Sequence, residues 1–161
     1  MKRFTQLLTS SKLNLSKKLI VAFFTLAIFT TTAFAADVNY KAVKHFKDHF
    51  KNVSNVTWVT TRENYTKVSF EEDGTQMEVF YNNDGEVVAS SKKIELNSLP
   101  AKATARISKR YSAPEYIVKE CIELTNDDET ASYVSLFRKN EKIILKVDQD
   151  GNVSEFKRSF N

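Results

Sequence analysis

Two stretches of the chain, "FYNNDGEVVAS" at residues 80–90 and "KVDQDGNVSEF" at residues 146–156, have the same order of residue types. In each, an apolar run leads into polar residues and an Asp-Gly pair, and a second run reaches valine two residues later. Glycine supplies the positive φ angle that a tight turn between antiparallel strands requires. We therefore predict two β-hairpins, with tight turns at Asp84-Gly85 and at Asp150-Gly151.

The apolar residues before the two turns repeat at a constant offset of 66 positions. The matched pairs are Tyr81 and Val147, Val79 and Leu145, Met77 and Ile143, Phe70 and Leu136, and Val68 and Val134. Successive side chains of a strand point to opposite faces of a sheet, and the members of each set are in phase. We expect these ten residues to share one buried face.

A helical pattern precedes each hairpin. In residues 39–52 the expected N-cap is Asn39, and in residues 98–114 it is Ser98. The expected apolar stripes are Val43, Phe46 and Phe50 in the first helix, and Ala103, Ile107 and Tyr111 in the second. The predicted fold class is α+β, with two tandem helix-plus-antiparallel-sheet repeats sharing one core. The repeats would cover about residues 38–97 and 98–161 of a single domain at residues 36–161.

The first 35 residues have the pattern of a signal peptide: bases without acids, an apolar run at residues 19–30, and a small-x-small site at residues 33–35. These residues carry five of the 24 bases and none of the 20 acids, so the remainder has a net charge of −1. The basic character therefore belongs to the leader, and a nucleic-acid partner is not expected. We predict a periplasmic or secreted protein that is free of the membrane after cleavage.

Several further signals follow the leader: Phe46 and Phe50, the Val56-x-Trp58 pair, Tyr65, the "SLP" at residues 98–100, and the two Asp-Gly turns. In these residues the chain resembles the PepSY-like, beta-lactamase-inhibitor-like family of small exported bacterial proteins. The resemblance covers nearly all of the chain after residue 35, and its motifs are packing and turn signals. It implies tandem helix-plus-sheet repeats and a periplasmic or secreted setting.

Few residues suggest catalysis or metal binding. His45 and His49, the only histidines, are spaced to lie on one helix face, which we expect to be the solvent face. Cys121 has Lys119 and Glu123 at equal spacing, so no net activation of its thiol is expected. The Asp-Gly loops lack the charged end residues of a calcium loop. We predict a protein that is not an enzyme and has no catalytic residues, no metal ligands and no cofactor.

Aromatic residues also occur out of phase with the repeated core face, interleaved with charged residues. The predicted partner-binding residues are Tyr65, Phe80, Tyr133, Phe137 and Ile144. Rings among charges are typical of protein-binding surfaces, where tyrosine supplies contact area at low entropic cost. The alternative is that loops or the other repeat cover these rings.

The preferred functional interpretation is an exported, non-enzymatic and inhibitor-like binding module that engages an envelope protein or peptide through this aromatic sheet face. The alternative is a periplasmic protein that handles a small ligand or a metal, using His45 and His49 or a cleft at the repeat junction. The partner's identity and the oligomeric state do not follow from the sequence.

Overall fold

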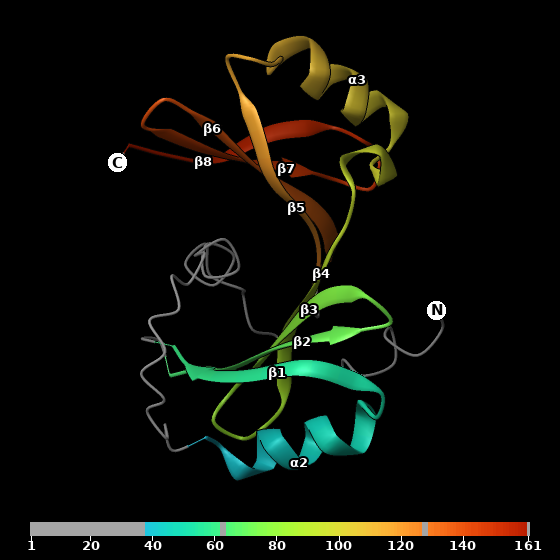
Figure 1. The fold of residues 1–161 in the computed structure, drawn as a ribbon, viewed down its shortest axis with the longest axis vertical. Coiled ribbons are helices and arrows are strands. Elements are labelled where there is room, and N and C mark those ends of the chain that lie inside the picture. The colour runs from blue at the N-terminus through green and yellow to red at the C-terminus, as the bar shows by residue number, and fades with distance from the viewer. Residues whose placement is uncertain (1–37, 62–63, 127–128, 161) are drawn as a thin grey trace. The chain divides into compact units, whose positions relative to one another are not determined.

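The computed structural model describes residues 38–61, 64–126 and 129–160. The predicted signal peptide lies outside the described residues. The elements, in chain order, are α2 (Tyr40–His49), β1 (Val53–Thr60), β2 (Thr66–Glu72), β3 (Thr75–Tyr81), β4 (Val87–Lys93), the 3-10 helix η1 (Leu96–Ser98), α3 (Ala101–Arg110), β5 (Ile117–Asn126), β6 (Thr130–Arg138), β7 (Glu141–Val147) and β8 (Val153–Phe160) (Figure 1).

The predicted fold class is wrong. The eight strands form one sheet in the order β1 to β8, and the chain is mostly β, with two short α-helices among the described residues. Strand β2 pairs antiparallel with β1 and β3, and neighbouring strands from β5 to β8 also pair antiparallel. Because β4 is hydrogen-bonded to β5, the sheet continues past the point where we expected one repeat to end.

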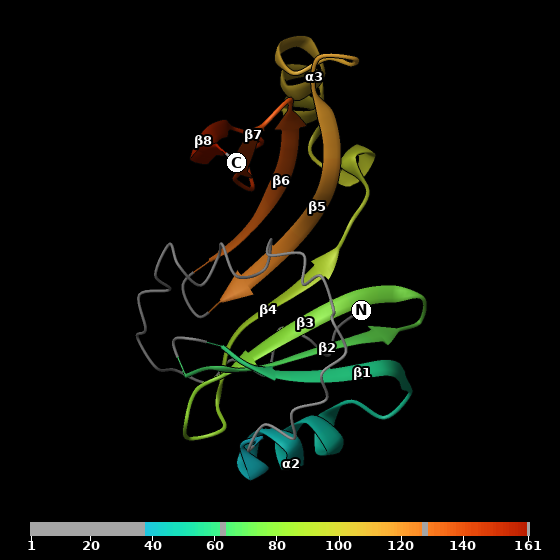
Figure 2. The same ribbon diagram turned by 60° about the vertical axis from the view of Figure 1, so that its left-hand side comes forward.

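The chain forms two compact units. Of the described residues, unit 1 contains those from Val38 to Ser91 together with Asn126, and unit 2 contains Lys92 to Thr125 and Glu129 to Phe160. In each unit one helix packs on one face of its strands, and Figure 2 shows this arrangement from a second direction.

All ten predicted core residues are buried, but they belong to two hydrophobic clusters rather than to one shared core. In unit 1, Val68, Phe70, Met77, Val79 and Tyr81 pack with Phe46 and Phe50. In unit 2, Val134, Leu136, Ile143, Leu145 and Val147 pack with Ala103, Ile107 and Tyr111. Each helix thus covers the apolar strand face of its own unit, and its stripe supplies the other half of that cluster.

Helix α2 begins at the predicted N-cap residue, whereas α3 does not. Asn39 caps α2, since its side chain accepts a hydrogen bond of 3.0 Å from the backbone N–H of Lys41. In α3 the N-cap is Pro100, and Ser98 belongs to the preceding 3-10 helix. Proline suits a helix start because it has no N–H to leave unpaired there. The apolar stripe of α2 is also displaced, with Ala42 fully buried and Val43 half-buried.

The repeated Asp-Gly pairs lie in five-residue loops, not in the tight two-residue turns that we predicted. In the first loop the Asn82 side chain accepts hydrogen bonds from the backbone N–H groups of Asp84 and Glu86, at 2.9 and 3.0 Å. In the second, Asp148 accepts one of 2.8 Å from the N–H of Asn152. Both glycines have positive φ angles, 79° and 76°.

Each loop also lies against the N-terminus of the helix in its own unit. A Cβ atom on Gly85 would lie 2.4 Å from the Cβ of Lys41, and one on Gly151 would lie 3.0 Å from the Cβ of Pro100. Asn39 joins the first loop by donating a hydrogen bond of 2.8 Å to the carbonyl of Asn83. Glycine is therefore required here for closeness to the helix as well as for backbone conformation.

We predict that Gly85→Ala lowers the free energy of unfolding more than Gly74→Ala does. Both glycines have positive φ, which costs an alanine about 1–2 kcal/mol. Gly74 has open space around its Cβ position, whereas Gly85 faces α2, so overpacking adds about 1–3 kcal/mol there. Urea unfolding of the two variants measures the difference; equal losses would show that the loop moves away from the helix without cost.

A second prediction concerns acid sensitivity in the loop of unit 2. Hydrogen bonds from the side chain and backbone of Asn152 lower the pKa of the Asp148 carboxyl. Such a group stabilises the fold above its unfolded pKa, and that stabilisation is lost as the pH falls through its lower folded pKa.

Asp148→Asn should therefore flatten the fall in unfolding free energy below the ordinary aspartate pKa of 3.8. The first loop carries an asparagine at the matching position, Asn82, so the cap can be kept. Urea unfolding at several pH values measures the slope, and Asp150→Asn is the control. An unchanged slope in Asp148→Asn would contradict the assignment.

Candidate functional site

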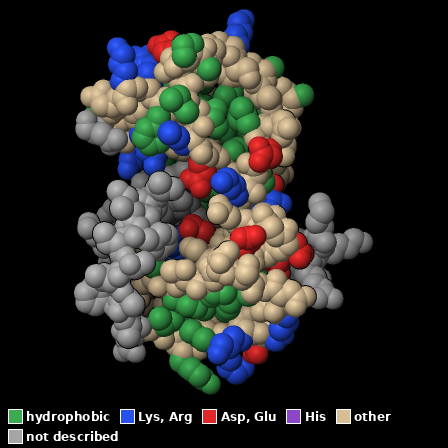
Figure 3. All heavy atoms as spheres, viewed as in Figure 1, with side chains coloured by type: hydrophobic (Ala, Val, Ile, Leu, Met, Phe, Trp, Pro, Cys, Tyr) green, Lys and Arg blue, Asp and Glu red, His purple; other side chains and the backbone are tan. Residues whose placement is uncertain are grey.

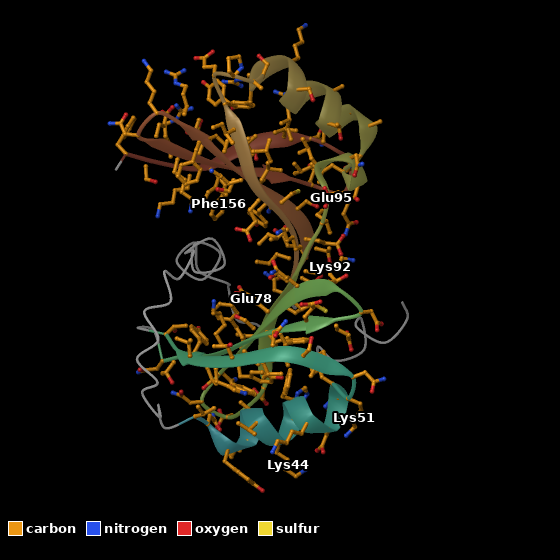
Figure 4. The ribbon with its side chains drawn as sticks, in the orientation of Figure 1. Lys44, Lys51, Glu78, Lys92, Glu95 and Phe156 are labelled. Carbon is orange, nitrogen blue, oxygen red and sulfur yellow. The ribbon has the colours of Figure 1, made fainter. Side chains whose placement is uncertain are left out.

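In unit 1, the strand face opposite α2 carries an ion pair beside an aromatic ring. The Nζ of Lys67 lies 2.8 Å from Oε1 of Glu78, which also accepts a hydrogen bond of 3.0 Å from the Ser69 hydroxyl. The same ammonium group lies 6.0 Å from the ring centroid of Phe80. Figure 4 shows Glu78 on the side of the sheet away from α2.

One carboxylate oxygen on this face has no hydrogen-bond partner among the described residues. It is Oε2 of Glu78, which is buried. Buried carboxylate oxygens normally accept at least one hydrogen bond, because their desolvation is otherwise uncompensated. This face of unit 1 therefore has an acceptor in place for a donor from outside the described residues.

In unit 2, the strand face opposite α3 is richer in aromatic rings. Tyr133 contacts Phe156 edge to face, with ring centroids 5.3 Å apart, and Figure 4 labels Phe156 on this side. Lys142, directly opposite Phe137 on the neighbouring strand, places its ammonium group 5.6 Å from that ring. Lys146, opposite Tyr133, is paired with Glu129. Burial is the main cause that raises the pKa of the Tyr133 hydroxyl to about 12.

The structure divides the five predicted partner-binding residues into two groups. Phe80, Tyr133 and Ile144 are buried, with 0, 1 and 2% of their surface exposed, and Tyr65 and Phe137 are half-buried. The first three do not present an accessible surface as they stand, and only the last two do so in part. The role of all five in partner binding stays a prediction.

The histidine pair lies differently from the prediction. His49 is exposed, but His45 is half-buried, with its ring edge-to-face against Tyr81 at 5.5 Å between centroids. The prediction that both lie on the solvent face is therefore wrong for His45. Burial, and secondarily the neighbouring His49, lowers the pKa of His45. Within the described ranges, no group of three or more His, Cys, Asp or Glu side chains could hold a metal ion.

Cys121 is a buried member of the unit 2 core. Burial, and then the nearby Glu120 and Glu95, raises the pKa of its thiol to about 12. A nucleophilic cysteine needs a thiolate and access, and this side chain has neither at neutral pH. The geometry agrees with a structural cysteine.

An apolar groove of about 460 Å³ in unit 2 was not anticipated from the sequence. It is lined by Leu96, Ile107, Ser108, Tyr111, Ser112, Ala113, Tyr116, Ile117 and Val118. Figure 3 shows apolar side chains gathered over this part of unit 2, and Ile117 is 54% exposed. The groove depends on how the end of α3, the following loop and the start of β5 meet, so residue spacing alone carries no signal for it.

The solved structures with a similar fold include three from Bacteroides species. A candidate periplasmic protein from Bacteroides eggerthii has a TM-score of 0.66 at 13% identity, over 76% of this chain and 88% of that one. A BLIP-like protein from Bacteroides fragilis has a TM-score of 0.62 at 18% identity, over 77% and 88%. A DUF2874 family protein from Bacteroides uniformis has a TM-score of 0.63 at 11% identity, over 75% and 88%.

These likenesses bear on the fold. They support a BLIP-like fold, which agrees with the beta-lactamase-inhibitor-like part of the resemblance, while its PepSY-like part stays a prediction. No protein-family model matches the sequence, and the search of curated proteins found no significant match. Among the helices that the structure describes, none is long and apolar enough to cross a membrane.

We predict that Cys121 does not react with a thiol reagent in the folded protein at neutral pH. The side chain is buried, and its raised pKa keeps the thiol protonated at neutral pH, whereas such reagents require an accessible thiolate. Absorbance after addition of an aromatic disulfide measures the reaction, with the urea-unfolded chain as the positive control. Rapid reaction of the folded chain would show that this part of the core opens readily.

Proposed function

We propose that the chain is an exported, non-enzymatic binding module of the periplasm or the secreted fraction, which engages an envelope protein or peptide. It would act like an inhibitor, by covering or sequestering its partner without making or breaking bonds. The BLIP-like fold of one structural neighbour and the periplasmic description of another support this proposal. Its placement in a PepSY-like family is part of the same proposal.

The observation that carries the proposal is the composition of the strand faces opposite the two helices. In each unit, charged side chains lie against aromatic rings, with Lys67 near Phe80 in unit 1 and Lys142 near Phe137 in unit 2. Aromatic anchors ringed by charges are typical of protein-binding surfaces. The unpaired Oε2 of Glu78 supports the same interpretation, since a donor from a partner would satisfy it.

The five predicted partner-binding residues differ in how far their side chains are exposed, and they would have different roles in binding. Tyr65 and Phe137 are half-buried and would contact the partner directly. Phe80, Tyr133 and Ile144 are buried and would form the floor beneath that contact. Buried aromatic residues hold neighbouring side chains in place. They would therefore reduce the conformational entropy that the more exposed side chains lose on binding.

The experiment is affinity capture with matched phenylalanine variants. The protein is immobilised, exposed to envelope extract from its own source, and the retained protein is identified and then titrated as a purified partner. Phe137→Ala should weaken binding by at least about 1 kcal/mol, since an anchor at an interface centre costs that much when truncated.

The control is Phe160→Ala, which removes the same side chain from a site with 71% exposure. Phe160 on β8 is paired with Glu141 on β7. The next residue on β7, Lys142, is paired with Phe137. Successive residues point to opposite faces, so Phe137 and Phe160 lie on opposite faces of the strands. Phe160→Ala should therefore leave affinity unchanged. Equal affinity of the native chain and of Phe137→Ala, or equal losses in both variants, would contradict the proposed surface.

A further inference from the structure

Strand β1 is an edge of the sheet and contains no charged residue. It is the first strand in the order β1 to β8, so β2 is its one neighbour among the described strands, as Figure 2 shows. Each of the other described strands contains at least one Lys, Arg, Asp or Glu. Edge strands usually carry charges or proline, which prevent pairing with another chain, and β1 has neither.

The first part of β1 is protected by a β-bulge, but the second part is not. The register with β2 shifts between Ser54 and Thr57, and Asn55 has a φ angle of 54° there. A bulge twists an edge strand and interrupts its row of backbone groups. From Thr57 to Thr60 the register with β2 is unbroken. The regular, open part of the edge is therefore residues 57–60.

The turn that follows β1 shows which backbone groups point to the open side. The N–H of Thr61 donates a hydrogen bond of 2.8 Å to the carbonyl of Tyr65, at the start of β2. Successive residues of a strand direct their N–H and C=O groups to opposite edges, so those of Val59 also point to β2. Those of Trp58 and Thr60 point away from it. The open edge thus offers a donor and an acceptor at each of these two positions.

We propose that two copies of the chain pair antiparallel through β1, with the two-fold axis between their Val59 residues. Trp58 of each copy then lies opposite Thr60 of the other, and each of these pairs exchanges N–H···O=C hydrogen bonds in both directions. Val59 lies opposite its own counterpart in the non-hydrogen-bonded position, where Cα atoms are about 4.5 Å apart. Every outward-pointing backbone group of Trp58 and Thr60 gains a partner in this way.

The absence of charge makes this edge complementary to itself. A two-fold contact uses the same patch on both copies, and like charges directly opposite each other on paired strands are destabilising. Strand β1 brings no charge to such a contact. The other edge strand, β8, carries three charged residues, Glu155, Lys157 and Arg158. The charges therefore favour β1 over β8 as the edge at which a second copy pairs.

The side chains on both faces of the strand fit the same pairing. Val59 is 38% exposed and lies opposite Lys67 of β2, on the strand face away from α2. The two Val59 side chains would cover each other there. On the other face Trp58 contacts Phe46, and Thr60 of the second copy would lie beside it. Pairs of an aromatic and a β-branched residue across strands are stabilising.

The first test is the mass of the native protein in solution, purified from cells that express the full chain. A strand pair of this length is a small interface, so the dimer should be weak and should form as the concentration rises. In sedimentation equilibrium the average mass should increase toward that of two chains. A mass of one chain at concentrations up to about 1 mM would overturn the inference, because the dissociation constant would then be weaker than millimolar.

The variant that removes the dimer but keeps the fold is Thr60→Pro. Its ring replaces an N–H that points away from β2, and proline is tolerated in edge strands at such positions. The average mass should fall to that of one chain, while the circular dichroism spectrum stays that of the native protein. A folded Thr60→Pro variant that dimerises like the native chain would place the contact elsewhere and overturn the inference.

Crosslinking tests the register. Val59→Cys places two thiols at the two-fold axis, within the Cα separation of about 4.4–6.8 Å that a disulfide allows. With oxidised glutathione it should form a covalent dimer on a non-reducing gel. Cys121 is buried, so the native chain should give none.

The matched control is Thr57→Cys, an exposed position on the same strand face. In the proposed register it lies four strand positions from its counterpart, roughly 13 Å at about 3.3 Å per residue, which is too far for a disulfide. Absence of crosslinking in Val59→Cys, or equal crosslinking in both variants, would contradict the pairing. None of these experiments uses the envelope partner, so their failure leaves the proposed function standing.

Discussion

The close approach of a glycine-containing loop to the N-terminus of a helix is the constraint on which each unit depends. Gly85 lies so near Lys41 that a side chain there would force the loop or the helix to shift, and Gly151 lies close to Pro100. The loop fixes where the helix begins, and the helix stripe then meets the in-phase apolar residues of the strands. Phe46 and Ile107 are the stripe residues that each helix buries in the cluster of its own unit.

The other faces of the strands follow from the same arrangement. Since each described helix packs on one face of the strands of its own unit, the opposite face of those strands holds aromatic rings and charged side chains. The Lys67–Glu78 pair lies beside Phe80, and Tyr133 lies against Phe156. This distribution of rings and charges is the observation on which the proposed binding role of these faces rests.

Several elements could be predicted from residue spacing because they depend on local chemistry. The Asn39 cap, the buried positions Phe46 and Ile107, and the buried alternation before each Asp-Gly pair were found where expected, whereas α2 buries Ala42 more fully than the predicted Val43. The candidate site was less predictable. Period-two alternation shows which residues share a face, but it does not show how far neighbouring strands cover them, so the burial of Phe80, Tyr133 and Ile144 was missed. The apolar groove of unit 2 had no sequence signal, because it joins residues from separate elements.

By itself, the sequence determined the strand faces, the two helices and the glycines of the two loops, since these depend on hydrophobic periodicity and on backbone conformation over a few residues. Only the tertiary structure decided that the strands continue as one eight-stranded sheet and that the core is two clusters, because strand pairing between β4 and β5 joins residues distant in the chain. It also decided that His45 contacts Tyr81 rather than solvent. That contact depends on the position of α2 on the sheet, which the helical spacing does not specify.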